Sequence, residues 1–187
     1  MKIERSVGSQ PPRIGTQELR FDAIAAKIMQ TELFETTPHP GKFIVAEVNN
    51  QNIFVYPKEK TDISFYAAVQ KDEDTDLSFV ALSIYTRSKN NGYYPGFPRG
   101  RILAQEAYKF LAEHNKVDGI AATWVEGEDN YVKYLKEKTN GLSNQQAALR
   151  TWTGTNVAKV FDLTQNVTVK PGMVEELVPK FDVRFMK

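Results

Sequence analysis

Residues 92–104 read GYYPGFPRGRILA, and this stretch divides the chain into two kinds of pattern. Its glycines and prolines end any strand that comes before it. Arg99-Gly100-Arg101 then leads into an amphipathic segment, in which apolar residues recur at helical spacing at Leu103, Ala107, Phe110 and Leu111. We therefore predict a helix over residues 101–114 with one buried face.

Two apolar segments flank this predicted helix. Residues 77–86 are apolar on both faces, which indicates a central strand covered on both sides. Residues 119–125, which include Trp124, form a second short apolar pattern that is compatible with a strand. A strand, a helix and a strand in this order are the outline of a right-handed crossover unit.

The rest of the chain alternates between strand patterns and helix patterns. Upstream of the crossover unit, we predict strands over residues 43–48, 53–56 and 63–70, with the acidic segment 72–76 as a solvated turn. Downstream, we predict helices over residues 129–138 and 144–151, the second capped by Ser143 and Gln146. Strands over 166–170 and 181–185 close the chain, joined through Pro171-Gly172.

These patterns predict an α+β protein. The expected architecture is a mixed, mostly antiparallel central sheet with helices on both faces. Residues 1–15, rich in glycine and proline, are expected to form a flexible lead. A helix capped by Thr16 would follow, and residues 16–187 would form a single domain, the usual outcome for a chain of 187 residues.

Composition excludes several classes of function. The chain has 24 Lys and Arg against 23 Asp and Glu, a net charge of +1, so dedicated nucleic-acid binding is not expected. It has no cysteine and only two histidines, and we expect no metal site. No apolar run reaches the ~20 residues of a membrane helix, and the N-terminus lacks the apolar core of a signal peptide. We expect a soluble protein, either cytoplasmic or delivered by a bacterial secretion system without a cleavable signal.

The start of the predicted helix at Arg99 is a candidate anion site. A helix N-terminus leaves backbone N–H groups unpaired and carries partial positive charge, so it binds phosphate. Gly100 would let the backbone approach an anion closely, and Arg99 and Arg101 would add charge-assisted hydrogen bonds. The alternative is an ordinary helix start with two solvated arginines.

In its element order, the chain resembles the GNAT family of acyltransferases. The family's pyrophosphate loop has the pattern Gln or Arg, two residues, Gly, one residue, and Gly or Ala. Arg99 and Ala104 match it, whereas Ile102 stands where the first glycine belongs. The resemblance implies an N-acyltransferase, or a catalytically reduced relative, that binds acyl-CoA pyrophosphate at Arg99, Gly100, Arg101, Ile102 and Ala104. It leaves the small-molecule or protein acceptor unspecified.

The same resemblance implies a role for one of two tyrosines. GNAT-like enzymes often place a tyrosine on the helix after the apolar strand, where it protonates the departing thiolate, and Tyr134 or Tyr131 would take this role. A phenol, with a pKa of about 10, suits a thiol leaving group. Apart from the resemblance, Glu126 or Glu128 would act as a base toward an amine, directly or through water, if burial raised the pKa of either. The alternatives are a core position for Tyr131, a partly exposed Tyr134 and a solvated Glu126.

A second resemblance covers residues 97–163. An Arg-Gly helix start, a strand that ends at Trp124, an Ala-Ala helix and a Thr-x-Thr-Gly turn are similar to a module of bacterial polymorphic toxins, whose own strand ends in Gly-x-Trp. The matching positions are Trp124, the turn ending at Asn130, Ala147-Ala148, and Thr151 to Gly154. This likeness suggests an effector that binds a macromolecular or nucleotide partner through the same basic surface. Thr153 and Gly154 would form an anion nest, or Thr153 would cap the next helix.

Overall fold

The structure is a computed structural model that describes residues 32–35, 43–57, 59, 62–85, 97–174 and 177–187. The predicted N-terminal lead, the helix after Thr16 and residues 92–96 lie outside the described residues.

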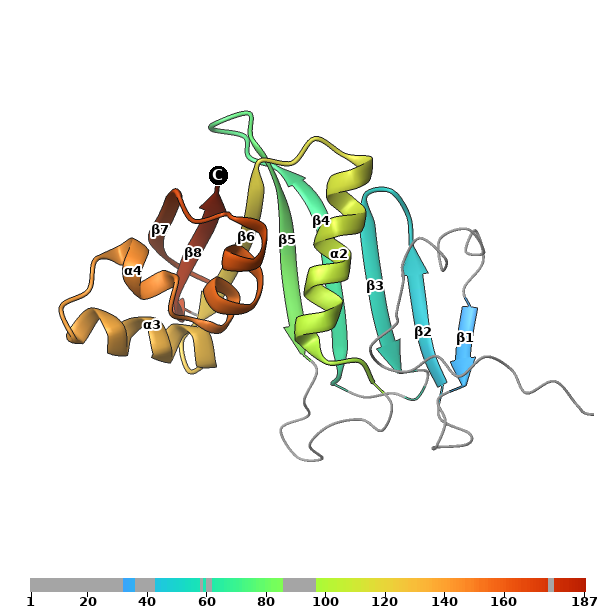
Figure 1. The fold of residues 1–187 in the computed structure, drawn as a ribbon. Coiled ribbons are helices and arrows are strands. Elements are labelled where there is room, and N and C mark those ends of the chain that lie inside the picture. Colours follow the sequence, from blue (N-terminus) through green and yellow to red (C-terminus); the bar gives the residue numbers. More distant parts are fainter. Residues whose placement is uncertain (1–31, 36–42, 58, 60–61, 86–96, 175–176) are drawn as a thin grey trace, which may run out of the picture.

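A single mixed sheet organises the described part of the chain (Figure 1). Its eight strands follow the order β1-β2-β3-β4-β5-β6-β8-β7, and every neighbouring pair is antiparallel except β5 and β6. The prediction of an α+β protein with a mostly antiparallel sheet is confirmed. The strands are β1 Glu32–Glu35, β2 Phe43–Val48, β3 Asn52–Pro57, β4 Ser64–Lys71, β5 Ser78–Tyr85, β6 Gly119–Val125, β7 Asn166–Met173 and β8 Pro179–Met186.

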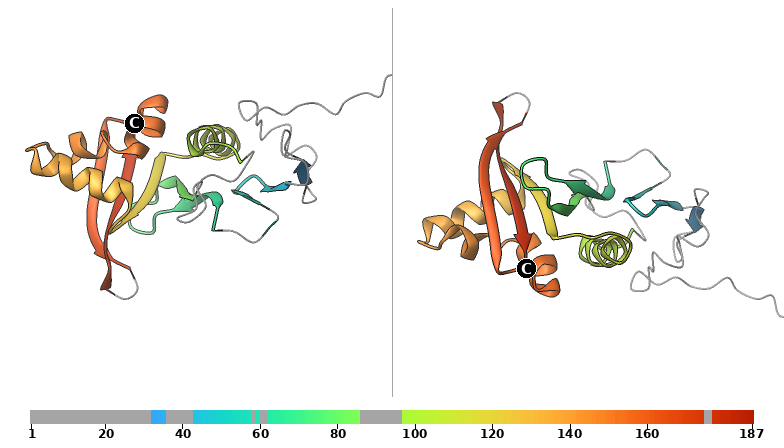
Figure 2. Two further views of the ribbon diagram at one scale, coloured as in Figure 1. Left: turned by 90° about the horizontal axis from the view of Figure 1, so that it is seen from below. Right: turned by 90° about the horizontal axis from the view of Figure 1, so that it is seen from above.

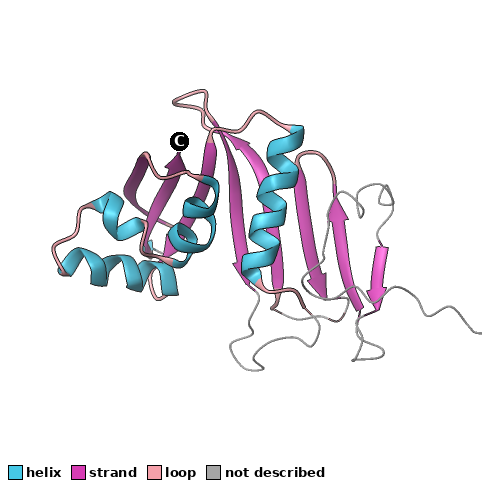
Figure 3. Ribbon diagram, in the orientation of Figure 1, coloured by secondary structure: helices cyan, strands magenta, loops and turns pink. Residues whose placement is uncertain are grey.

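Helices occupy the connections in the second half of the chain (Figure 3). The long helix α2, Gly100–His114, links β5 to β6, as the crossover pattern predicts. After β6 come α3 (Asp129–Thr139), the short α4 (Asn144–Ala148), the π-helical turn η1 (Gly154–Ala158) and the 3-10 turn η2 (Lys159–Phe161). Among the described residues, no helix is long and apolar enough to span a membrane.

Alternation along the strands sends the apolar side chains to one face. Val80 on β5 pairs with Ile120 on β6, and Ile120 with Phe185 on β8, so that these buried residues form one row beneath the helices. Helix α2 packs on β4 and β5, while α3 contacts β6 and α4 contacts β7 (Figure 2). Within the described residues, no helix covers the opposite face, on which Tyr66 and Tyr85 are exposed, so the predicted helices on both faces are found on one face only there.

The parallel strands β5 and β6 are hydrogen-bonded over only part of their length. Their pairing runs from Phe79 opposite Gly119 to Ala81 opposite Ala121 and goes no further. Beyond it, residues 82–85 and 122–125 diverge toward the carboxyl ends of both strands (Figure 1). We call these two diverging segments the β5–β6 fork. Helix α2 begins at this end of the sheet.

Two predicted boundaries in the C-terminal part were wrong. The helix predicted over residues 144–151 ends at Ala148, and a turn leads to the π-helical η1. The reason is the close packing of Gly154 against the end of α4, described below. Pro171-Gly172, predicted to be a connection, lies inside β7. A proline fits there because β7 is the edge strand of the sheet.

Candidate functional site

The N-terminus of α2 has no side-chain cap. Its N-cap residue, Arg99, has an extended backbone and makes no capping hydrogen bond. The Arg99 carbonyl accepts the N–H of Ile102 at 2.9 Å and the N–H of Leu103 at 3.1 Å. The backbone N–H groups of Gly100 and Arg101 have no hydrogen-bond partner among the described residues. Of the two residues that carry these donors, Arg101 is exposed and Gly100 is buried.

Charge at this helix start is uniformly favourable to an anion. Arg99 and Arg101 are both exposed, and the first turn of α2 contains no acidic residue. Gly100 is buried between them, so the backbone lies against the protein rather than projecting from it. The partial positive charge of the helix end adds to both guanidinium groups.

Ile102 and Ala104 contribute differently from what the loop pattern implies. The N–H of Ile102 already bonds to Arg99, and its side chain is half-buried. Ala104 is fully buried, and its backbone N–H lies beyond the first turn, where helical hydrogen bonding satisfies it. Ile102 and Ala104 therefore pack beneath the first turn of α2. The backbone N–H donors without a partner among the described residues belong to Gly100 and Arg101.

The two candidate tyrosines of α3 lie side by side against β8. Tyr134 is 4% exposed, contacts the rings of Trp124 and Phe181, and donates its hydroxyl proton to Asn144 Oδ1 at 3.1 Å. Burial raises the pKa of the Tyr134 phenol above its ordinary value. Its hydroxyl is thus directed toward the start of α4.

Tyr131 lies one turn earlier, close to where α3 begins. Its ring stacks on Phe181 at a centroid separation of 5.1 Å, and 9% of the residue is exposed. Its hydroxyl has no hydrogen-bond partner among the described residues. Because α3 begins where β6 ends, Tyr131 is the nearer of the two tyrosines, along the chain, to the carboxyl end of β6.

Glu126 is an exposed residue in the turn between β6 and α3. Its backbone N–H donates to the Pro179 carbonyl at 2.9 Å, which fixes the turn against β8. Its neighbour Glu128 instead receives the N–H of Val125 on its carboxylate at 3.0 Å. The Glu126 carboxylate has no partner among the described residues and lies at the fork end of the sheet, whereas the Glu128 carboxylate accepts a hydrogen bond within the turn.

Trp124 is a core residue, because only 1% of it is exposed and its ring contacts Phe185 and Tyr134. Its indole nitrogen has no hydrogen-bond partner among the described residues.

Asn130 joins the start of α3 to the turn that precedes η1. Its carbonyl oxygen accepts the backbone N–H of Trp152 at 2.9 Å and that of Thr153 at 3.4 Å. Its amide group donates to the Thr153 hydroxyl at 3.1 Å. The predicted helix cap at Thr153 was wrong, because its hydroxyl accepts from Asn130 and caps no backbone N–H. The sequence resemblance thus marked residues that hold two elements together.

The turn from Thr151 to Gly154 does not form an anion nest. The Thr151 hydroxyl accepts the Gly154 N–H at 3.2 Å and donates to the Ala148 carbonyl at 2.7 Å, and Thr151 is fully buried. The N–H of Thr151 donates to the Ala148 carbonyl and those of Trp152 and Thr153 donate to Asn130, so internal partners satisfy the turn. A Cβ on Gly154 would lie 2.3 Å from the Ala148 carbonyl oxygen, which explains the glycine.

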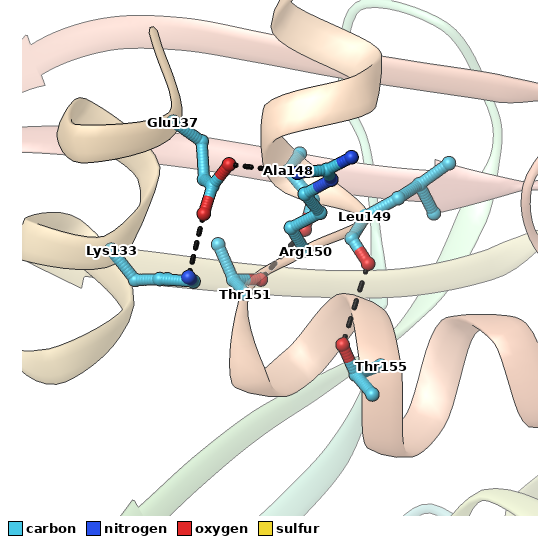
Figure 4. Close-up of polar contacts among 7 residues, drawn as sticks. All are labelled: Lys133, Glu137, Ala148, Leu149, Arg150, Thr151 and Thr155. Atoms are coloured by element: carbon cyan, nitrogen blue, oxygen red, sulfur yellow. Dashed lines mark hydrogen bonds and ion pairs between the residues drawn. The ribbon is translucent and has the colours of Figure 1, made fainter. Parts of the chain in front are cut away.

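A buried carboxylate that the sequence did not predict lies beside this turn (Figure 4). Glu137 is 5% exposed and bridges two cations, with Lys133 Nζ at 2.6 Å and Arg150 Nη1 at 3.2 Å. The hydrogen bond from Lys133 lowers the pKa of Glu137, and the charges of Lys133 and Arg150 lower it further, against the opposing effect of burial. Only the spacing of Lys133 and Glu137, one helical turn apart, is visible in the sequence.

Among the described residues, no group of three or more His, Asp or Glu side chains is placed to hold a metal ion. The structure thus brings Arg99, Gly100 and Arg101 together at the start of α2. It assigns Trp124, Asn130, Thr153 and Gly154 to the packing of the C-terminal half. Comparisons of the chain with protein-family models, with curated proteins and with solved structures found no match.

Proposed function

We propose that the protein is a GNAT-like N-acyltransferase, or a catalytically reduced relative, that binds acyl-CoA at the start of α2. The pyrophosphate would accept hydrogen bonds from the backbone N–H groups of Gly100 and Arg101. Arg99 and Arg101 would neutralise its charge. The observation that carries the proposal is an uncapped, glycine-containing helix start beside the β5–β6 fork.

The position of this helix start within the sheet supports the proposal. In open sheets with parallel strands, ligands bind outside the carboxyl ends of the strands where neighbouring strands separate. The fork is such a place, because β5 and β6 stop pairing after Ala81 and Ala121. Helix α2 directs its positive end toward the same edge of the sheet (Figure 1).

The backbone of the fork also suits a ligand with an extended amide-containing arm. Residues 82–85 of β5 pair with β4 on one side, and residues 122–125 of β6 pair with β8. Their facing sides do not pair with each other, which leaves N–H and C=O groups for an added extended chain. The pantetheine arm of CoA carries two amides and would place its thioester between the strands.

Of the two tyrosines, Tyr131 is the better candidate for the acid that protonates the departing thiolate. The hydroxyl of Tyr134 is held by Asn144, on the side of α3 that faces α4. Tyr131 lies in the first turn of α3, and no partner among the described residues occupies its hydroxyl. Glu126 would serve as the base toward an amine acceptor.

Thermal denaturation with acetyl-CoA tests the proposal. Stabilisation should grow with the logarithm of ligand concentration and reach about 2.7 kcal/mol at one hundred times Kd. S-acetylpantetheine, which keeps the thioester and the amide arm but lacks the pyrophosphate and the nucleoside, should stabilise much less. No shift at millimolar acetyl-CoA would remove the proposal.

The second candidate is an effector that binds a nucleotide through the same residues without transferring an acyl group. It is favoured by the exposure of Arg99 and Arg101 and by Ile102 at the position of the family's first glycine. Equal stabilisation by acetyl-CoA and by ADP would favour this candidate. Stabilisation by acetyl-CoA well beyond that by ADP would favour the acyltransferase.

A further inference from the structure

A second place on the molecule combines a cavity with unpaired hydrogen-bond donors. A surface cavity of about 220 Å³ lies between the end of α3, α4 and η2. Its lining residues are Leu142, Gln146, Leu149, Arg150 and Lys159. Helix α4 packs on the edge strand β7, which is separated from β6 by β8. The cavity is therefore distinct from the β5–β6 fork.

The side chains that line this cavity offer hydrogen-bond donors from Gln146, Arg150 and Lys159. The Gln146 side-chain oxygen accepts the Ser143 N–H at 3.0 Å, and its amide N–H₂ has no partner in the described part of the chain. Arg150 uses Nη1 for Glu137, and its side chain is 59% exposed, so its other N–H groups stay available. Lys159 is exposed and makes no ion pair among the described residues. No acidic residue lines the cavity.

Its apolar groups are two leucines, Leu142 and Leu149, which are only partly buried against the core. Both therefore retain apolar surface that a ligand can cover. An inorganic anion would satisfy the donors and leave this surface in water. A carboxylate attached to a short apolar group would accept hydrogen bonds from the donors and cover the surface of the two leucines.

The backbone at the cavity's edge is unusual as well. The N–H of Lys159 bonds to the Gly154 carbonyl and closes the π-helical turn η1. Such turns are rare and occur frequently at functional sites. Here the turn sets Lys159 at the cavity.

We propose that this cavity binds a small aliphatic carboxylate, with the carboxylate between Arg150 and Lys159 and the apolar group on Leu142 and Leu149. The ligand is either a free acid or the C-terminal residue of a peptide. This inference does not depend on acyl-CoA binding at α2.

Amide chemical shifts in ¹⁵N-labelled full-length protein test the proposal, with 4-methylpentanoate as the probe. We expect saturable shifts at Leu142, Leu149 and Lys159 in the millimolar range. The neutral 4-methylpentanamide and inorganic phosphate should each bind about tenfold more weakly or worse. Tighter binding of N-acetyl-Gly-Leu would assign the ligand to a peptide C-terminus, and tighter binding of 4-methylpentanoate to a free acid.

Two variants complete the test. Lys159→Met should weaken binding about tenfold, and Lys159→Glu should abolish it. Lys136→Met removes an exposed lysine of α3 that does not line the cavity, and it should leave the affinity unchanged. Absence of saturable shifts, equal binding of the amide or of phosphate, or equal weakening by Lys136→Met would each overturn the proposal.

Discussion

The guanidinium of Arg184 on β8 forms an ion pair with the buried carboxylate of Asp72, in the turn between β4 and β5. The guanidinium carbon of Arg184 lies 5.1 Å from the centre of the Phe79 ring. Strand β6 lies between β8 and β5, with Ala121 opposite Arg184 and Gly119 opposite Phe79. The pair ties β8 to β5 at the end of the sheet where β5 and β6 are hydrogen-bonded, opposite the fork.

Asp72→Asn should lower the free energy of unfolding at neutral pH. It should also make that free energy fall less steeply as the pH is lowered. Burial raises the pKa of Asp72, but hydrogen bonds from Thr75 and Asp74 and the Arg184 charge outweigh it, so the pKa lies below its ordinary value near 4. A lowered folded-state pKa gives stability that is present above the unfolded pKa and is lost as pH falls through the folded one. Urea midpoints between pH 7 and pH 2 measure this. If the urea midpoint changes equally with pH in the wild type and in Asp72→Asn, the stabilising role of the Asp72 carboxylate is contradicted.

Gly154→Ala should destabilise the protein by about 2–3 kcal/mol, because the new methyl group would press on the Ala148 carbonyl and the Leu149 backbone. Gly172→Ala is the matched control. Its Cβ would meet side-chain atoms alone, of Lys180 at 3.1 Å and of Asp182 at 3.8 Å, and should change stability by about 0.5 kcal/mol or less. Denaturant unfolding compares the two, and similar losses would refute the packing role of Gly154.

The Asn130 side chain should contribute about 2 kcal/mol through its hydrogen bonds to the turn before η1. Asn130→Ala leaves the buried turn N–H groups without their acceptor, which costs about 1–3 kcal/mol. Asn130→Asp keeps the acceptor for Trp152 and loses only the donor to Thr153, so its cost should be smaller. If the two variants unfold at the same urea concentration, the Asn130 side-chain oxygen does not account for the stabilisation.

Tyr131→Phe and Tyr134→Phe should separate chemistry from packing. If Tyr131 protonates the thiolate, its loss should lower kcat about a hundredfold, within the usual range for general acids, with little effect on the KM for acetyl-CoA. Tyr134→Phe should cost about 1 kcal/mol of stability through the lost hydrogen bond to Asn144 and leave kcat nearly unchanged. Thiol release and urea unfolding measure the two effects. The reverse pattern would move the role to Tyr134.

Much of the fold could be predicted because local pattern and tertiary environment agree. β2 and β6 begin and end where their apolar runs do, and α2 begins one residue before its predicted start. The crossover from β5 to β6 follows from the order of the patterns. The end of α4 did not follow, because it depends on Gly154 packing against Ala148, a contact that no local propensity reports.

The site was only partly predictable for the same reason. The uncapped start of α2 follows from the glycines and prolines before an amphipathic run. The sequence does not show that the N–H of Ile102 donates to the Arg99 carbonyl, nor that the Tyr134 hydroxyl donates to Asn144. Both contacts depend on the three-dimensional arrangement of the backbone. Asp72 shows the limit most clearly. An aspartate in an acidic turn was predicted to be solvated, yet it is buried because Arg184, distant in the sequence, reaches it.

Isothermal titration with acetyl-CoA tests the central claim most directly. The proteins to compare are the wild type, Arg99→Ala/Arg101→Ala, and the charge-matched control Lys109→Ala/Lys116→Ala, in which both lysines are exposed. We predict saturable binding by the wild type and the control, and binding at least about tenfold weaker by the arginine variant. The difference should shrink as salt is raised. Equal affinity in all three proteins, or no binding by the wild type at millimolar ligand, would contradict an acyl-CoA site at the start of α2.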